Sequence, residues 1–590
     1  MDSPIDGRLS SLRARMKEKD LDAFIVYATD QYLNEYIPQE ENMRVYLSGF
    51  TGSTGNMLVT ETEAYLFVDG RYYTQADLEV SKSLIHVIKM PYGTSGIQAL
   101  RDQIKKLVES SDTASFTIGF NGRKVSYQDI HLLIQDSLDL GFQMDDTGDD
   151  LIGYPISPME KENNGSLMTI PLSITGKSSS EKMQSIREWL IDHECDFVLI
   201  SQLDDLAYLC NMRSYEIPYN STFKGLAFLS RSEGHIFLNV NPIPEWIKEH
   251  FHGVFQVHSE EDFTEIIPKI LVYKTDVPIK VGFDRDRTPY YTVNQLSQWV
   301  NEPGDLVQLE SPLSKMKRIK TPEELKYMAH SFHQADRVIK KSIDWLNKEI
   351  NSGETVSERD FSDKVKDTFF AHEAKSLSFE VITASGENAA IVHYTKADPN
   401  KILKAGDLML LDTGAYFEGG YATDLTRTFL IGGSETKATV RQQEIYTLVL
   451  KSAIRVLKAR FPMGTKGIHL DTLARAPLWD YGYIYNHGTG HGVGICVHEV
   501  PPRVSSTSDD VLEESMVFSV EPGLYIEGYG GVRIENLVTL VRDPQYDGWL
   551  QVQPLTFAPL DKNLIDYGYL DRWEKEWLKE YMEKSAGLES

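Results

Sequence analysis

The hydrophobic pattern of the first half of the chain predicts helices and strands in alternation. Residues 8–21 carry apolar side chains at helical spacing, and the apolar run DAFIVY at 22–27 is typical of a strand. The same order of helix and strand returns at 182–201, where Asp196 takes the place of Asp22. This recurrence predicts a duplicated α/β domain, although one aligned pair of elements can also arise by chance.

We expect the two copies to occupy residues 1–165 and 175–312. The segment 158–180 between them is polar and rich in Ser, Gly and Asn, which is typical of a linker. A chain of 590 residues is also too long for a single hydrophobic core, so several domains are expected on length alone.

After Pro312 the pattern changes to longer helices and separate strands. Thr-Pro-Glu-Glu at 321–324 is a typical helix start, and apolar residues follow at helical spacing to about residue 350. Further helices are predicted at 355–373, 438–460, 467–481 and 570–586, and strands at 376–384, 388–395, 408–417, 426–433, 516–525 and 531–541. Residues 313–590 are therefore expected to form a mixed α+β domain.

Composition and charge narrow the class of protein. Hydrophobic residues make up 41% and charged residues 25% of the chain, as in ordinary globular proteins, and no apolar run reaches the roughly 20 residues of a membrane span. The polar N-terminus lacks the apolar region of a secretory signal. The net charge of −27 argues against nucleic acid or an anionic membrane as a partner. The scattered cysteines are typical of reduced thiols, so we expect a cytoplasmic protein: Cys195, Cys210 and Cys496.

A glycine-rich stretch is the first candidate for chemistry. Its sequence, HGTGHGVGICVH at 487–498, holds His487, His491 and His498 with four glycines between them. Imidazole is a common metal ligand and a common acid or base at neutral pH, and glycines let the backbone approach a bound group closely. The alternative is a glycine-rich turn that carries three incidental histidines.

Two aspartates lie on a predicted hairpin upstream of this stretch. Asp412 and Asp424 stand at equal distances from a hairpin tip at Glu418, and Asp412 shares its strand face with apolar residues. A carboxylate on the apolar face of a strand is costly unless it is paired or binds a metal.

A second predicted hairpin repeats the arrangement, with Glu521 and Glu535 placed symmetrically about Gly528. Four carboxylates in a space of low dielectric constant repel one another unless cations neutralise them, and two divalent ions supply enough positive charge. With one histidine as a further ligand, this oxygen-rich set suits Mn²⁺, and Zn²⁺ or Co²⁺ are also possible. The alternative is that the four residues are ordinary acidic residues of two hairpins.

These motifs together resemble the pita-bread metallopeptidases, in particular their three-domain aminopeptidase P branch. In the second half the resemblance rests, in order, on SFEVITASGENAAIVHY, LLDTGAYFEGGYATDLTRTF, HGTGHGVGICVHE, SVEPGLY and GVRIEN. In the first half it rests on LSGFTGSTGNMLVTETEAYLFVDGRYYTQA and LDDLAYLCNMRSYEIPYN, and near the C-terminus on LTFAPLDKNLIDYGYL. The resemblance implies two creatinase-like N-terminal α/β domains, followed by a pita-bread α+β catalytic domain.

The resemblance implies a ligand set for two divalent metal ions. Asp412 would bind one ion, and Asp424 would bridge both. His491 would bind the second ion, Glu521 would complete its shell, and Glu535 would be the other bridge.

The resemblance also implies an activity, which is hydrolysis of the first peptide bond in peptides with proline in the second position. The two metals would activate a water, and Glu521 would act as general base and then as general acid. His393 and His498 would bind the peptide and the developing oxyanion, His487 would line the same pocket, and Arg533 would support the site. The alternatives are that His393 is a core histidine at a strand end and Arg533 a simple cross-strand ion pair.

Three departures from the family pattern bear on peptide length rather than on the ligands. The segment from Asp412 to Asp424 is one residue longer than usual, so a longer or bulged hairpin tip is expected. The spacing from His491 to His498 is seven residues, as in prolidases and short aminopeptidases P, whereas the three-domain branch usually has two more. The segment DQYLNEY at 30–36 has Gln-Tyr where the branch commonly has Pro-His.

The residues leave other functions open. The chain could be a prolidase that cleaves only Xaa-Pro dipeptides, a metal-free hydrolase of the creatinase type, or a non-catalytic pita-bread binding module. The resemblance implies a homodimer, with Trp479 near the neighbouring subunit, unless Trp479 is simply a core residue.

Overall fold

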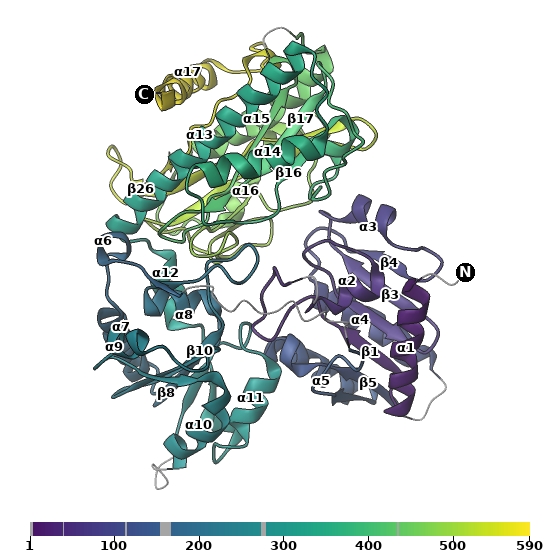
Figure 1. Cartoon of the computed structure of the whole chain (residues 1–590), viewed down its shortest axis with the longest axis vertical. Helices are drawn as coiled ribbons and strands as arrows, with labels where there is room; N and C mark the ends of the chain where they lie inside the picture. Colours follow the sequence, from purple (N-terminus) through teal and green to yellow (C-terminus); the bar gives the residue numbers. More distant parts are fainter. Residues whose placement is uncertain are drawn as a thin grey trace. The chain divides into compact units, whose positions relative to one another are not determined.

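The computed structural model describes residues 4–38, 41–111, 115–153, 167–272, 279–433 and 436–589. By its internal contacts the chain forms two compact units (Figure 1). Unit 1 contains Met1–Thr169, Lys177–Ile217 and Thr222–Ser314, and unit 2 contains Ile170–Gly176, Pro218–Ser221 and Lys315–Ser590. Residues 158–166 of the predicted linker lie outside the described residues, and its remainder holds a short strand and one helical turn, β7 (Met168–Thr169) and α6 (Leu172–Thr175).

The first part of unit 1 is a six-stranded mixed sheet with the strand order β4-β3-β2-β1-β5-β6. β1 pairs antiparallel with β2 and parallel with β5, so the sheet changes strand direction at its centre. The strands are β1 (Ala23–Val26), β2 (Met57–Thr60), β3 (Ala64–Val68), β4 (His86–Lys89), β5 (Phe116–Phe120) and β6 (Phe142–Asp146). The helices are α1 (Pro4–Glu18), α2 (Met43–Ser48), α3 (Tyr73–Glu79), α4 (Gly96–Ser110) and α5 (Tyr127–Leu140).

The second sheet of unit 1 repeats the first strand for strand, in the order β12-β11-β10-β8-β13-β14. The parallel and antiparallel pairings also repeat. The strands are β8 (Phe197–Ile200), β10 (Gly225–Ser230), β11 (Gly234–Leu238), β12 (Gln256–Ser259), β13 (Val281–Phe283) and β14 (Leu306–Gln308). The helices are α7 (Ser179–Asp192), α8 (Leu203–Cys210), α9 (Glu245–His250), α10 (Phe263–Val272) and α11 (Tyr290–Ser297).

The duplication predicted from the aligned aspartates is confirmed at the level of single hydrogen bonds. The Asp22 carboxylate accepts the backbone N–H of Thr117 at 2.8 Å, and the Asp196 carboxylate accepts that of Lys280 at 3.1 Å. Each aspartate therefore fixes the start of the central strand against the next parallel strand of its own sheet.

The two copies also contact each other through equivalent residues. The N–H of Tyr127, at the start of α5, donates to the carbonyl of Thr288 at 2.9 Å. The N–H of Tyr290, at the start of α11, donates to the carbonyl of Val125, also at 2.9 Å. Such reciprocal bonds between matching positions are the mark of an isologous, two-fold interface, so the copies associate like the halves of a symmetric dimer.

The longest helix of unit 2 has the start that the sequence predicts. α13 (Pro322–Ser352) has Thr321 as N-cap, whose hydroxyl accepts the N–H of Glu324, and Gly353 ends it in the left-handed conformation. The other predicted helices correspond to α14 (Glu358–Ala371), α15 (Val440–Leu457), α16 (Gly467–Trp479) and α17 (Arg572–Ala586).

Two helix pairs each cover a sheet of unit 2. Residues of α13 and α14 form one apolar core with the sheet β16-β17-β19, and residues of α15 and α16 form a second core with the sheet β20-β27-β26-β23. The strands of these sheets are β16 (Ile382–Ser385), β17 (Leu408–Thr413), β19 (Leu425–Leu430), β20 (Arg460–Pro462), β23 (Val517–Val520), β26 (Asn536–Arg542) and β27 (Trp549–Pro554). Short pairs join β15 (Ser376–Leu377) to β18 (Ala415–Tyr416), β21 (Gly490–His491) to β22 (Arg503–Val504) and β24 (Gly523–Ile526) to β25 (Gly530–Arg533).

The strand predicted at 388–395 is wrong. This segment continues from a short 3₁₀ helix, η5 (Gly386–Ala390), into irregular loop. Its backbone bends around the buried carboxylate of Glu358, which accepts hydrogen bonds from Asn388 and Tyr394. Ala389 of this segment packs with residues of β16 and β17, and a pattern of hydrophobicity cannot distinguish such a buried loop from a strand.

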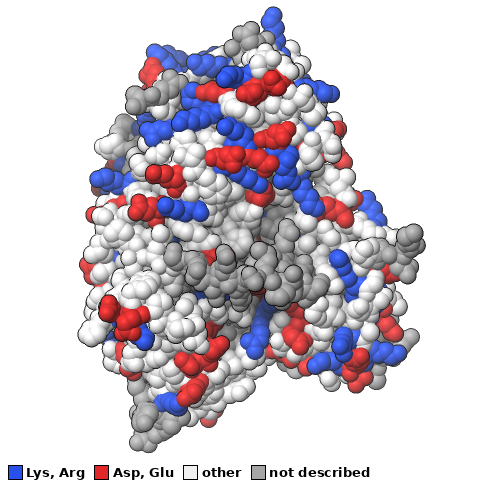
Figure 2. Space-filling model, in the orientation of Figure 1, with Lys and Arg blue, Asp and Glu red and all other residues white. Residues whose placement is uncertain are grey.

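The surface of the described residues mixes both signs of charge. On the face drawn in Figure 2, Asp and Glu side chains are interspersed with Lys and Arg, although the net charge of the chain is −27. Among the described residues, no helix combines the length and apolar character needed to span a membrane.

Candidate metal centre

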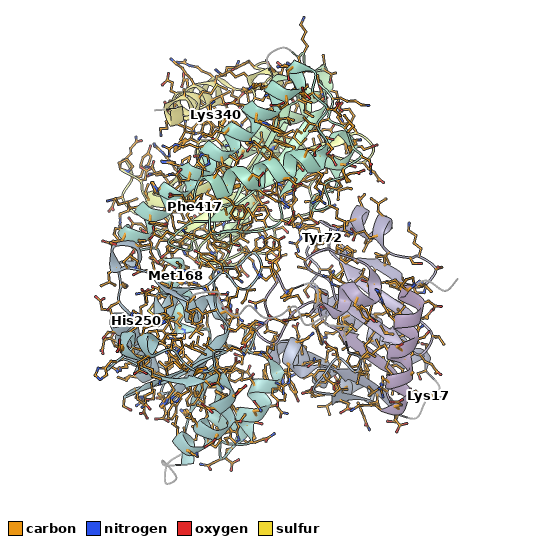
Figure 3. All side chains as sticks on the ribbon, viewed as in Figure 1. Lys17, Tyr72, Met168, His250, Lys340 and Phe417 are labelled. Atoms are coloured by element: carbon orange, nitrogen blue, oxygen red, sulfur yellow. The ribbon has the colours of Figure 1, made fainter. Side chains whose placement is uncertain are left out.

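The first hairpin places two aspartates on neighbouring strands of unit 2. Asp412 lies in β17 opposite Thr426, and Asp424 directly precedes β19. The pairing is centred on Gly419, one residue later than the tip predicted at Glu418. A bridge between Tyr416 and Ala422, on either side of the turn, has the same centre. Phe417 (labelled in Figure 3) follows β18 in this hairpin and belongs to the apolar core that includes residues of α13 and α14.

The second hairpin has the predicted register. Ile526 pairs with Gly530 and Val520 pairs with Asn536, so the two arms are symmetric about Gly528. Glu521 and Glu535 interrupt the two arms at opposite positions, between β23 and β24 and between β25 and β26. At the interruptions the backbone bonds to other segments: the N–H of Glu521 donates to the carbonyl of Thr489 at 2.8 Å, and that of Glu535 to the carbonyl of Thr426 at 3.1 Å.

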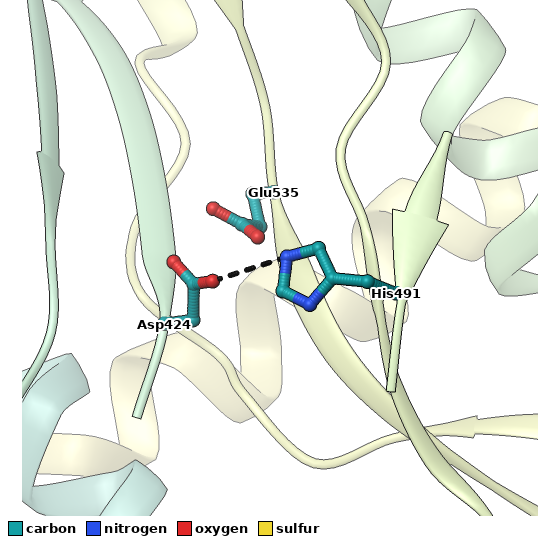
Figure 4. Close-up of side chains that lie close together, drawn as sticks. All are labelled: Asp424, His491 and Glu535. Atoms are coloured by element: carbon teal, nitrogen blue, oxygen red, sulfur yellow. Dashed lines mark ion pairs between the residues drawn. The ribbon is translucent and has the colours of Figure 1, made fainter. Parts of the chain in front are cut away.

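His491 joins the carboxylates from the glycine-rich stretch. Its Nε2 lies 3.4 Å from Asp424 Oδ2 and 3.3 Å from Glu521 Oε1. Asp424, His491 and Glu535 each offer one ligand atom within 4.8 Å of the others' (Figure 4). Gly490 permits this approach, because a Cβ there would lie 1.9 Å from the carbonyl oxygen of Ser519.

Asp412 and Glu535 each keep one carboxylate oxygen without a hydrogen-bond partner. Oδ2 of Asp412 accepts Arg533 Nη2 at 2.6 Å, and Oε2 of Glu535 accepts the hydroxyl of Thr426 at 2.8 Å. Oδ1 of Asp412 and Oε1 of Glu535 are buried and accept no hydrogen bond. A buried carboxylate oxygen without a hydrogen-bond donor costs free energy, and a bound cation would offset this cost.

Burial and mutual repulsion shift the pKa values of the cluster. Burial raises the pKa of Glu535 well above its usual value, and the charges of Asp424, Glu521 and Asp412 add to the shift. The pKa values of Asp412 and Glu521 are raised chiefly by burial as well, although Arg533 and His491 respectively oppose the shift. Burial alone would lower the pKa of His491, but Asp424 and Glu521 outweigh it and raise the value to about 9.

The predicted substrate-binding histidines lie around this cluster. The ring of His498 meets that of His491 edge to face, with centroids 4.5 Å apart. His393 follows Val392, whose carbonyl accepts Arg533 Nη1 at 3.2 Å. Through Arg533 the His393 segment is therefore tied to the cluster.

His487 belongs to a hydrogen-bonded chain that also contains a residue the motif analysis did not single out. Its Nδ1 lies 2.7 Å from the carbonyl oxygen of Gly488, and its Nε2 lies 3.0 Å from the Tyr525 hydroxyl. That hydroxyl accepts Arg533 Nη1 at 2.8 Å, and Arg533 in turn holds Asp412. These hydrogen bonds link His487, Tyr525, Arg533 and Asp412 in series. They thus hold Asp412, a candidate metal ligand, in place. The hairpin register offers a signal for Tyr525, because Gly523 pairs with Arg533 and Tyr525 lies diagonally across from it.

A buried ion pair that sequence reasoning also missed holds the loop of His498. Lys320 Nζ donates to Glu499 Oε1 and to the carbonyl of Lys317, and both side chains of the pair are 2% exposed. Glu499 Oε2 accepts the N–H of Ile495 at 2.9 Å. The pair joins the segment before α13 to the residues on both sides of His498.

The donor set fits two divalent cations. Four carboxylates and one imidazole converge, two of the carboxylate oxygens lack partners, and the carboxylates repel one another without neutralising charge. Oxygen-dominated ligation with a single nitrogen excludes soft metals and suits Mn²⁺, Zn²⁺ or Co²⁺.

The chain is similar to known proteins over its whole length. The model of metallopeptidase family M24 matches residues 326–542, and models of the creatinase/prolidase N-terminal domain match residues 8–139 and 158–324. The "Probable Xaa-Pro aminopeptidase P" of Laccaria bicolor is 30% identical over 97% of this chain and 89% of its own length. The chain belongs to metallopeptidase family M24, in its Xaa-Pro aminopeptidase P branch.

Solved structures separate this branch of family M24 from the prolidases. The X-prolyl aminopeptidase of Caenorhabditis elegans, described as a cytosolic enzyme with a di-nuclear active site, matches with a TM-score of 0.91 and 27% identity over 100% of this chain and 96% of its own. The Xaa-Pro dipeptidase of Bacillus anthracis matches with a TM-score of 0.53 and 26% identity, and it covers 65% of this chain and 99% of its own.

The family assignment confirms the predicted fold class and leaves finer points as predictions. Two creatinase-type α/β domains precede a pita-bread catalytic domain of family M24, as expected. The boundaries predicted at 1–165, 175–312 and 313–590 stay predictions, as do the roles assigned to single residues.

Proposed function

We propose that this M24 protein is an Xaa-Pro aminopeptidase, which removes the N-terminal residue from peptides with proline in the second position. The observation that carries the proposal is the similarity to named Xaa-Pro aminopeptidases along the whole chain, both N-terminal domains included. The converging hairpin carboxylates and His491 support it, because they offer ligands for the metal ions that a metallopeptidase uses.

We propose two Mn²⁺ ions as the native cofactors. Asp412 would hold one ion, His491 and Glu521 would hold the other, and Asp424 and Glu535 would bridge them. When bound, the ions would supply Lewis acidity that lowers the pKa of a water to near neutral and polarises the scissile carbonyl. Four carboxylates with one imidazole favour Mn²⁺ over softer metals.

The side chains of the chain would carry the proton and hold the peptide. Glu521 would accept a proton on a carboxylate oxygen and deliver it to the proline nitrogen, a task that suits a carboxyl whose pKa is raised by burial. His498 and His393 would donate hydrogen bonds to the peptide and the developing oxyanion. Arg533 would keep Asp412 in place through their 2.6 Å contact, and His487 would orient Tyr525 at the edge of the same pocket.

We further propose a homodimer that works in the cytoplasm. Trp479 at the end of α16 is 50% exposed, and Tyr481 and Ile484 beside it are 49% and 64% exposed. Three large apolar side chains in one short exposed segment favour a protein contact. The three cysteines are free thiols, as expected in a reducing compartment, and the C. elegans relative is described as cytosolic.

The test of the proposed activity compares two substrates at saturating Mn²⁺. An Xaa-Pro-Pro-Xaa tetrapeptide and the Xaa-Pro dipeptide with the same first residue are incubated with the protein, and the released amino acid is measured. We expect the tetrapeptide to be cleaved with the higher kcat/KM. Turnover of the dipeptide alone would identify a prolidase, which the short spacing from His491 to His498 favours.

A further inference from the structure

Glu358 is a fully buried carboxylate at the first position of α14, and its side chain points away from the helix into a loop. It is 0% exposed. Oε1 accepts the N–H and the hydroxyl of Ser385, both at 2.7 Å, and the side-chain amide of Asn388 at 3.1 Å. Oε2 accepts the hydroxyl of Tyr394 at 2.8 Å, the same amide at 3.1 Å and the N–H of Asp398 at 3.3 Å.

All of these donors come from the single segment 385–398, which contains His393. Two backbone N–H groups, two hydroxyls and one amide converge on one carboxylate. Hydrogen bonds to a charged acceptor are about twice as strong as those between neutral groups. Ser385 still belongs to β16, but residues 386–398 lie in no β-ladder, so Glu358 fixes a stretch that no sheet holds.

The opposite side of His393 is tied to the metal centre. The carbonyl of Val392 accepts Arg533 Nη1, and Arg533 Nη2 donates to Asp412. The start of the segment also packs closely on β25, because a Cβ at Gly531 would lie 2.0 Å from the carbonyl oxygen of Ala389. His393 thus lies between one residue anchored to Arg533 and one anchored to Glu358.

We propose that Glu358 is a positioning residue for His393 in the aminopeptidase reaction. It holds the Tyr394–Asp398 side of the segment, so that the His393 imidazole meets the bound peptide in a fixed place. The proposal rests on the proposed function for the role of His393, and on the hydrogen bonds of residues 385–398 for the role of Glu358.

The chemistry of the donors predicts which substitution separates positioning from folding. In Glu358→Gln the amide oxygen can still accept from Ser385, whose backbone N–H cannot reverse. The amide nitrogen then faces Tyr394 and Asp398. The Tyr394 hydroxyl can rotate and accept a hydrogen bond from this nitrogen, whereas the N–H of Asp398 loses its acceptor. The damage falls on the side next to His393. Tyr394→Phe removes the hydroxyl's bond to Glu358 on that side and the 3.0 Å bond that it accepts from the Asn388 amide.

The matched control is Glu574→Gln, the same exchange at another glutamate of unit 2 that is 0% exposed. Glu574 lies in the first turn of α17 and pairs with Lys451 at 2.7 Å and Arg455 at 3.3 Å. Its ion-pair partners belong to α15, and Oε2 also accepts the N–H of Asp571 at 2.8 Å, so none of these partners lies in the segment of His393. We expect Glu574→Gln to lower the thermal midpoint while leaving kcat/KM unchanged.

The experiment measures kcat and KM on an Xaa-Pro-Pro-Xaa peptide, bound Mn²⁺ and hydrogen exchange in residues 385–398 for the wild type and these variants. We expect Glu358→Gln and Tyr394→Phe to lower kcat/KM about 10- to 100-fold, since small misplacements of a reacting group cost this much. Bound Mn²⁺ should match the wild type, and exchange should rise in 385–398 only.

The same substitution in a His393→Ala background decides whether Glu358 acts through His393. We expect Glu358→Gln to cost less than about threefold there, because residues that act as a unit are not additive. An equal loss in both backgrounds, a loss of Mn²⁺, or unchanged exchange in 385–398 would overturn the proposal. A wild-type protein inactive on the peptide would instead refute the proposed function, while the exchange measurement would still test the hold of Glu358 on the segment.

Discussion

His491 lies between the carboxylates of Asp424 and Glu521, and we expect its protonation to compete with metal binding. The pKa of this imidazole is raised to about 9 by Asp424 and Glu521. Below that pH the metal-free protein holds His491 protonated, whereas a metal ligand must be neutral. We therefore expect a metal ion that binds His491 to displace its proton in the neutral range.

Calorimetry of Mn²⁺ binding tests this exchange at residue scale. Since the folded-state pKa of His491 lies above neutral, we expect binding at pH 7.5 to release about one proton or more, and affinity to rise with pH up to about 9. The release is obtained from titrations in buffers of different ionisation enthalpy. Binding heats that do not depend on the buffer between pH 7 and 9 would contradict this prediction.

Glu535→Gln tests the repulsion among the carboxylates. Because the pKa of Glu535 is raised in the folded state, the metal-free protein is stabilised when this carboxyl is protonated, and that contribution is lost as the pH rises above about 4.3, its unfolded value. We expect the variant, unfolded in EDTA at pH 7.5, to melt a few degrees higher than the wild type, at about 2–4 °C per kcal/mol. Activity with Mn²⁺ should fall by roughly 100-fold or more, as a bridging ligand is lost. A metal-free variant that melts below the wild type would show that repulsion is not the dominant effect.

Several residues of the centre could be predicted from the sequence because they break a pattern. Asp412 stands out on an apolar strand face, and Glu521 and Glu535 stand out by their symmetry about Gly528. Tyr525 breaks no pattern, since an aromatic residue in a buried strand is ordinary. Its role depends on the diagonal contact with Arg533, which requires the register of the hairpin.

At the scale of elements, the candidate substrate histidines lie in loops rather than in helices or strands. Buried charged side chains hold those loops in place. Lys320 and Glu499 do so for the loop of His498. A Cβ at Gly494 would lie 2.1 Å from Glu499 Oε2, so the loop closes tightly on this carboxylate. Rigid support of this kind is needed to place a histidine against a substrate.

Lys320→Met tests the support at element scale. Breaking a buried pair leaves an uncompensated charge, so we expect a loss of about 3–5 kcal/mol in the unfolding free energy, together with a lower kcat/KM. The double variant Lys320→Met/Glu499→Gln should recover part of the stability, because no buried charge is then left alone. Denaturant unfolding measures both. A double variant less stable than the single one would contradict the role of charge.

The element scale also shows where prediction from sequence fails. The capped α13 has local signals at both ends, Thr321 and Gly353, and its start was predicted correctly. The segment 388–395 has strand-like residues but no partner strand, and the carboxylate of Glu358, distant in sequence, decides its path. Such distant hydrogen bonds leave no periodic trace in the sequence.

At the scale of the whole molecule, unit 1 consists of two copies of one α/β domain. Its two sheets share strand order and pairing, and they meet through reciprocal bonds at Tyr127 and Tyr290. One aligned helix and strand were enough to predict the duplication. The reciprocal contact could not be predicted, because a repeat in sequence does not specify how its copies associate.

Trp479→Glu tests the proposed homodimer. A charge in the exposed apolar segment of Trp479, Tyr481 and Ile484 should oppose burial there, so we expect the dimer to dissociate to monomers at micromolar concentration. Light scattering coupled to size exclusion gives the mass. Val440→Glu is the control, because Val440 is also apolar and highly exposed but begins another helix. A wild-type monomer, or a dimer in both variants, would contradict the proposed interface.

The most direct test of the central claim is metal-dependent release of the first residue from an Xaa-Pro-Pro-Xaa peptide. The protein is stripped of metal with a chelator, and activity is then measured as Mn²⁺ is added back. The account predicts no release by the stripped protein and full activity at about two equivalents of Mn²⁺, with no cleavage of a matched peptide that has alanine in the second position. Full activity in the stripped protein, or equal cleavage of the alanine peptide, would contradict it.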